Sequence, residues 1–150
     1  MDIPSDESSL AHAFALAAEL RGLVGRLKRR LREQAGGGDL TPSQVSVLLR
    51  LEQEGRATTS SLARAEGMRP QSMAAVIAAL ESANLVSGAP DPADGRQTLL
   101  SLTEACRQRI QEGRAARQDW LSRRLQARLS SDEMELLATA VGLLKRIADD

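Results

Sequence analysis

Cysteine and histidine are almost absent from this chain of 150 residues, which contains only Cys106 and His12. One cysteine excludes a disulfide bond within the chain, and one cysteine with one histidine cannot supply the ligands of a structural zinc site. The spacing of the carboxylates does not indicate a site for another metal. The sequence therefore predicts no metal ion and no cofactor.

Aromatic residues and long hydrophobic runs are also scarce, since the chain has one Trp, one Phe and no Tyr. Leucine and alanine must fill the core, which favours packing of helix on helix. No apolar run approaches the roughly 20 residues that cross a bilayer, and the polar, acidic segment 1–9 is unlike a signal peptide. We therefore expect a folded protein of the cytoplasm with no membrane partner.

Motifs of the common catalytic sites are missing as well. The chain has no nucleophile elbow, no phosphate-binding glycine loop and only one histidine. The glycines at 36–38 follow a helical pattern instead of a strand, so they predict a loop. We expect no catalytic residues and therefore no enzyme.

The formal net charge is zero, with 20 Lys and Arg against 20 Asp and Glu. This balance argues against strong non-specific binding to nucleic acid, which depends on the release of counterions from phosphates. Basic residues do cluster in two segments, 26–32 and 107–117. Each cluster is also consistent with an ordinary solvated helix face, so charge alone leaves the partner open.

Hydrophobic periodicity predicts a mainly helical chain with one β-hairpin. Thr41, Pro42 and Gln44 have the residue types of a helix start, and the buried face of that helix is assigned to Val45, Leu48, Leu49 and Leu51. Asn84 is expected to end a later helix in the left-handed conformation. The expected elements are helices over 8–34, 42–54, 59–66 and 70–82, strands over 85–87 and 97–102, a helix capped by Thr103, and a last helix after Ser130.

The order of a short helix, a glycine turn, a second helix and a hairpin indicates a helix-turn-helix with a wing. Gly67 provides the turn, and the outer face of the following helix is then free to enter a major groove of DNA. Arg69, Gln71 and Ser72 lie at the start of that helix, where side chains reach base edges or phosphates. The alternative is a helical hairpin with a surface turn and no role in DNA binding.

The segment LVSGAPDPADGRQTLLSLT, residues 85–103, resembles the wing of the multiple antibiotic resistance regulator (MarR) family, in which a D-x-x-D-x-R pattern leads into a strand and then L-T. The segments LTPSQVSVLLRLEQEG and SSLARAEGMRPQSMAAVIAALESANLV are similar to the family's second to fourth helices. The resemblance implies a mainly α fold with a small β-hairpin wing. It places a winged helix-turn-helix lobe at 40–102 and a helical dimerisation region at 8–35 and 103–149.

The resemblance also assigns roles on double-stranded DNA. Arg96 matches the wing arginine that enters the minor groove, and Asp94 matches the acid that holds this arginine in a bidentate pair. The alternative is an exposed turn pair of little energetic value. The chain departs from the family pattern at 87–89 and 74–75, where Ser-Gly-Ala and Ala-Ala replace basic or polar residues. We therefore expect modest affinity, or discrimination that depends on few side chains.

A homodimer with a palindromic operator and a small aromatic or phenolic acid as effector are further implications of the resemblance. The residues that bind such an effector are not identified by the sequence, although Trp120 and His12 are candidates for the lining of a pocket. Cys106 is expected to be inert, because oxidation sensors of this family carry their cysteine in the first helix. The predicted function is a ligand-responsive repressor, and the alternative is a winged-helix module for protein contacts.

Overall fold

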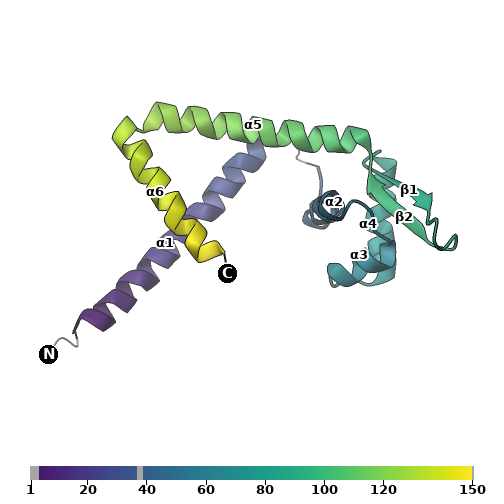
Figure 1. Ribbon diagram of the computed structural model, residues 1–150, viewed down its shortest axis with the longest axis horizontal. Helices are drawn as coiled ribbons and strands as arrows, with labels where there is room; N and C mark the ends of the chain where they lie inside the picture. The colour runs from purple at the N-terminus through teal and green to yellow at the C-terminus, as the bar shows by residue number, and fades with distance from the viewer. Residues whose placement is uncertain (1–3, 37–38, 150) are drawn as a thin grey trace. The chain divides into compact units, whose positions relative to one another are not determined.

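The computed structural model describes residues 4–36 and 39–149, so Gly37 and Gly38 of the predicted glycine loop lie outside the described residues. The chain divides into two compact units, Met1–Gly36 with Ala115–Asp150 and Gly37–Arg114. In chain order, the elements are α1 (Pro4–Gln34), α2 (Pro42–Glu54), α3 (Thr59–Ala65), α4 (Pro70–Ser82), β1 (Val86–Pro90), β2 (Thr98–Leu102), α5 (Glu104–Arg128) and α6 (Ser131–Ala148), labelled in Figure 1. Among the described residues, none of these helices is long and apolar enough to span a membrane.

Local capping chemistry explains where several helices begin. The Thr41 hydroxyl accepts from the backbone N–H of Gln44, whose side chain accepts from the N–H of Thr41. Ser130 and Glu133 form the same reciprocal pair at the start of α6. Pro70 is the first residue of α4, where its missing N–H costs nothing. These starts agree with the sequence prediction, whereas α1 begins at Pro4, four residues before the predicted Ser8.

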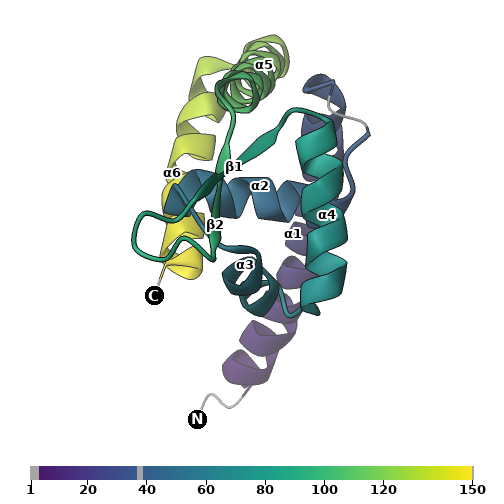
Figure 2. The same ribbon diagram turned by 90° about the vertical axis from the view of Figure 1, so that its right-hand side faces the viewer.

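The unit Gly37–Arg114 contains the hydrophobic core. Its helices α2, α3 and α4 pack against each other and against the hairpin, which Figure 2 shows on the opposite side of the unit from α4. The largest side chains with no more than 1% exposure form the centre of this core: Val47, Leu51, Leu62, Met73, Leu80 and Cys106 are among them. This packing holds the helix-turn-helix and the hairpin in one rigid frame.

The predicted buried face of α2 was partly wrong. Val47, Leu48 and Leu51 are buried, but Val45 and Leu49 are 40% and 47% exposed. Apolar residues occupy both the 47–48–51 and the 45–48–49 rows of this helix, so periodicity alone supports either face. The position of β2 and α4 decides between them, because both pack on the side that carries Val47 and Leu51.

The hairpin is antiparallel, with Val86 opposite Leu102 and Pro90 opposite Thr98. Ala57 adds a short bridge to Leu100, with backbone hydrogen bonds of 3.0 and 2.8 Å. The first strand therefore extends to Pro90, three residues beyond the predicted end at Ser87. At the base of the hairpin, Asn84 has the predicted left-handed conformation with φ 59°.

The other unit consists of α1, the later part of α5, and α6, and it differs from the first in the exposure of its apolar side chains. Large apolar side chains on α1 and α6 are exposed, among them Phe14 at 81%, Leu10 at 67% and Ile147 at 76%. No described residue of α6 is buried. Amphipathic helices with this much apolar exposure need a further surface to cover them.

Candidate nucleic-acid interface

The turn between α3 and α4 is set by hydrogen bonds at the end of α3. The N–H of Met68 donates to the carbonyl of Ala63 at 2.9 Å, and the N–H of Gly67 donates to that of Arg64 at 3.3 Å. This is the Schellman arrangement, and Gly67 takes its left-handed position with φ 63°. The turn brings α4 back across α3, as a helix-turn-helix requires.

The first turn of α4 is open to an external partner. Arg69 occupies the N-cap position, but its side chain makes no capping hydrogen bond. Arg69, Gln71 and Ser72 are all exposed. Unpaired N–H groups at a helix N-terminus attract anions such as phosphates. The structure therefore groups the three predicted residues of this helix at one accessible end.

The two faces of α4 differ sharply in burial. Met73, Ile77 and Leu80 are buried against the core. The outward face carries small side chains, and its exposed alanines are Ala74, Ala75, Ala78 and Ala79. A face of methyl groups can approach a groove closely, but it has few hydrogen-bond donors with which to read bases.

The hairpin tip carries Asp94 and Arg96 at exposed positions. The Asp94 carboxylate accepts from the backbone N–H of Arg96 at 3.1 Å. None of the ion pairs within residues 4–36 and 39–149 joins Asp94 to the Arg96 guanidinium. Asp94 thus shapes the turn of the tip, and its bidentate pair with the Arg96 guanidinium stays a prediction.

A network of hydrogen bonds around Glu66, next to the turn between α3 and α4, was not predicted from the sequence. The Glu66 carboxylate is 16% exposed, and it accepts from Ser46 Oγ at 2.9 Å and from Arg50 Nε at 3.0 Å. A carboxylate at a helix C-terminus is disfavoured by the helix dipole. Here the hydrogen bonds from Arg50 and Ser46 lower the pKa of Glu66 below its usual value. The network ties α2 to the residue that precedes the Gly67 turn.

We expect Glu66→Gln to lower the free energy of unfolding by about 1–2 kcal/mol at neutral pH, because charge-assisted hydrogen bonds are replaced by neutral ones. A carboxyl group with a lowered pKa stabilises the fold above its unfolded pKa, and this stabilisation disappears as the pH falls through the folded pKa. The difference between wild type and variant in urea unfolding should therefore shrink as the solution is acidified below pH ~4.5. Glu81→Gln, at an exposed position of α4, is the control, and an equal loss in both variants would contradict the assignment.

The lone cysteine lies in the core. Cys106 is 1% exposed, and its N–H donates to Thr103 Oγ1 at 3.0 Å, as expected for a helix capped by Thr103. Burial raises the pKa of the Cys106 thiol, although the positive charge of Arg109 partly opposes this. An oxidation sensor needs exposure and a lowered pKa, so the environment of Cys106 favours the inert interpretation.

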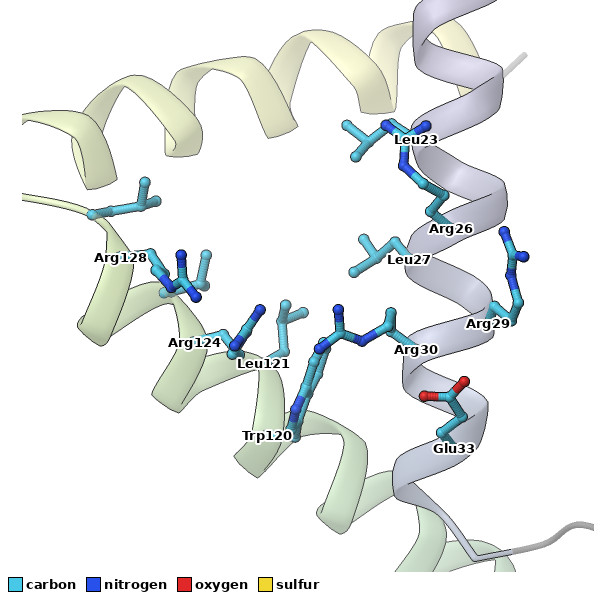
Figure 3. Close-up of a pocket in the computed structure, with 12 residues that line it drawn as sticks. Leu23, Arg26, Leu27, Arg29, Arg30, Glu33, Trp120, Leu121, Arg124 and Arg128 are labelled. Carbon is cyan, nitrogen blue, oxygen red and sulfur yellow. The ribbon is translucent and has the colours of Figure 1, made fainter.

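The two candidate pocket residues differ in their position relative to the groove that lies between α1 and α5. Trp120 lies in a groove between α1 and α5, in contact with two arginines (Figure 3). His12 is exposed on α1, outside the residues that line this groove.

The chain is similar to known transcriptional regulators over most of its length. The model of the MarR family matches residues 40–98. An uncharacterised HTH-type transcriptional regulator of Mycobacterium bovis is 40% identical over 135 residues, which cover 90% of this chain and 94% of the relative. An uncharacterised HTH-type transcriptional regulator of Mycobacterium leprae is 38% identical over 135 residues, which again cover 90% of this chain and 94% of the relative.

Solved structures agree with this similarity. A crystal structure from Pseudomonas aeruginosa, classed as a transcriptional regulator, is 37% identical and covers 92% of this chain and 97% of that one, with a TM-score of 0.76. A mutant of MepR from Staphylococcus aureus, bound to an oligodeoxyribonucleotide, is 19% identical and covers 88% of this chain and 97% of that one, with a TM-score of 0.71. The second likeness concerns the fold alone.

Proposed function

Because this chain belongs to the MarR family of transcriptional regulators, we propose that it binds a palindromic operator on double-stranded DNA as a homodimer. The observation that carries the proposal is the exposed first turn of α4, where Arg69, Gln71 and Ser72 follow the helix-turn-helix turn and Arg69 makes no side-chain capping hydrogen bond. A symmetric dimer would present two such helices to successive turns of one DNA face.

Each proposed DNA contact has a separate role. Arg69, Gln71 and Ser72 would contact base edges or phosphates in the major groove. Arg96, at the exposed tip of the hairpin, would enter the adjacent minor groove. Asp94 supports this role by bonding to the backbone N–H of Arg96, which orders the tip from which the arginine extends.

The dimer is supported by the exposed apolar faces of α1 and α6. Eleven large apolar side chains on these two helices are exposed to solvent in the single chain: Leu10, Phe14, Leu16, Leu23, Val24, Leu27, Leu136, Val141, Leu143, Leu144 and Ile147. Soluble monomers rarely leave this many large apolar side chains in water. A second copy of the same faces would cover it.

Replacement of the wing arginine tests the DNA assignment. We expect Arg96→Ala to weaken operator binding by about 5- to 150-fold, which corresponds to the loss of about 1–3 kcal/mol from one groove contact. Fluorescence anisotropy on DNA from upstream of the gene itself, across a salt series, measures the change. Arg123→Ala removes an arginine that is paired with Asp119 on α5, and it should bind as the wild type does. Binding no tighter than to a random duplex at low salt would refute the proposal.

A ligand-responsive repressor is the form of regulation that we propose. A small organic acid that binds one arrangement of the dimer better than another would shift the population and change operator affinity. A second function, a winged-helix module for protein contacts, is favoured by one observation, the alanine-rich outer face of α4. The anisotropy experiment distinguishes the two, because only DNA binding depends on both salt and Arg96.

A further inference from the structure

The outward face of α4 is fixed by the residues that this helix buries. The side chains that face the core are Met73, Ile77 and Leu80. Since each residue turns an α-helix by about 100°, the opposite direction in the first part of α4 belongs to Gln71, Ala75 and Ala78, which are all exposed. One amide and two methyl groups therefore form the centre of the surface that a helix-turn-helix presents to a major groove.

Gln71 supplies the hydrogen-bonding groups of this row. It lies in the first turn of α4 and is exposed, and the first residues of a recognition helix are those that contact base edges. A glutamine amide matches the major-groove edge of adenine, because it can donate to N7 while it accepts from the N6 amino group. The base that fits opposite Gln71 is therefore adenine.

Ala75 and Ala78 bring no donor or acceptor to the groove. An alanine methyl group that is pressed against a polar base edge excludes water from that edge and leaves its groups unpaired, which is unfavourable. The C5-methyl group of thymine is the apolar group that base pairs present in the major groove. The base that fits beside either alanine is therefore thymine.

The charge of the surrounding lobe increases the importance of these contacts. Residues 40–102 contain five arginines and no lysine, against six aspartates and glutamates. One of the five, Arg50, is paired with Glu66 at 3.0 Å. A lobe with so few cations releases few counterions from phosphates. Its affinity for one DNA sequence over another therefore depends strongly on the groups that α4 places at base edges.

We propose, on the basis of the DNA binding proposed above, that α4 selects operator half-sites with a core of A·T pairs. In such a core Gln71 binds an adenine, and thymine methyl groups pack against Ala75 and Ala78. From position 71 to position 78 the helix rises by about 10 Å, which corresponds to about three base-pair steps of 3.4 Å. This length sets the size of the core at about three to four consecutive A·T pairs.

Thymine-to-deoxyuridine replacement tests the methyl contacts, because it removes the C5-methyl group and keeps the base pair. The operator for this test is the duplex that the wild-type protein selects from a random pool. Each replacement in the half-site core that faces an alanine should raise the dissociation constant by about fourfold, the effect of one buried methyl group. Replacement of thymines outside the half-sites is the control, and it should leave the anisotropy titration unchanged.

Variants of α4 assign the lost contact to one alanine. Ala75→Gly removes the methyl group from the protein, so deoxyuridine at the facing thymine should cost this variant less than about twofold. Ala74→Gly makes the same change of helix propensity on a flank of α4, and it should keep the loss of about fourfold. Circular dichroism verifies that each variant is folded.

Replacement of Gln71 tests the contact with adenine. Gln71→Ala should remove the preference for adenine at one position of the half-site, a loss of discrimination of about 5- to 150-fold. The preferences at the thymine positions should remain. Titration of operators that carry each of the four base pairs at that position measures the change.

Two results would overturn the inference and leave the proposed function in place. One is a selected half-site with G·C pairs throughout its core, and the other is equal affinity for the thymine and deoxyuridine operators. If the protein selects no duplex over the random pool, the proposed function fails, and the assignment of α4 to A·T pairs fails with it.

Discussion

A glutamate in place of Phe14 is expected to dissociate the dimer and to weaken operator binding by about 100-fold or more. Phe14 is 81% exposed in the single chain, so the charge should not disturb the fold of the protomer. In the proposed dimer the same position is covered, and a buried unpaired carboxylate there is strongly unfavourable. A monomer presents one recognition helix, so it loses the gain in affinity that comes from linking two half-sites.

Light scattering and anisotropy on the same samples measure both effects of Phe14→Glu. Ala15→Glu introduces the same charge at the next residue, which lies on the polar side of α1 because each residue turns the helix by about 100°. This control should remain dimeric and should bind the operator. A dimeric Phe14→Glu protein with full affinity would remove this face of α1 from the interface.

Truncation of Leu51 to alanine is expected to lower the free energy of unfolding by about 2–5 kcal/mol. Leu51 has 0% exposure and lies in the core formed by α2, α4 and β2. The loss combines the transfer of its methyl groups to water with the cavity that remains. Such a change is a large part of the stability of a domain of this size.

Leu49→Ala is the matched control, since it makes the same chemical change on the same helix at a position that is 47% exposed. It should cost less than about 1 kcal/mol. Urea unfolding followed by circular dichroism compares the two variants, at one protein concentration because an oligomer's stability depends on it. Equal losses would mean that the face of α2 carrying Leu49 is also covered, as the sequence pattern alone had suggested.

Local chemistry made much of the fold predictable. The Thr41–Gln44 and Ser130–Glu133 caps, Pro70 at the start of α4 and the left-handed Asn84 all agree with the structure. Each depends on residues within four positions of one another, so the printed sequence contains the whole interaction. The order of the elements and the D-x-x-D-x-R segment were sufficient to indicate the family.

Local sequence patterns did not predict the contacts between residues that are far apart in the sequence. Glu66 meets Ser46 and Arg50 from 20 and 16 residues away, and nothing in the local sequence marks it as more than a surface acid. The Asp94 carboxylate had two possible partners in Arg96, and it bonds to the backbone N–H. Arg30 and Trp120 lie on different helices and meet only in three dimensions.

Short-range hydrogen bonding and hydrophobic periodicity specify the helices, the turn at Gly67, the hairpin and the residues at the start of α4, so these features follow from the amino-acid order. Tertiary structure decided which face of α2 is buried, that Cys106 lies in the core, and that Arg30 and Arg124 share Trp120. These features depend on which surfaces approach one another. The sequence pattern shows that a helix face is apolar, but only the packing of the folded chain determines which surface covers that face.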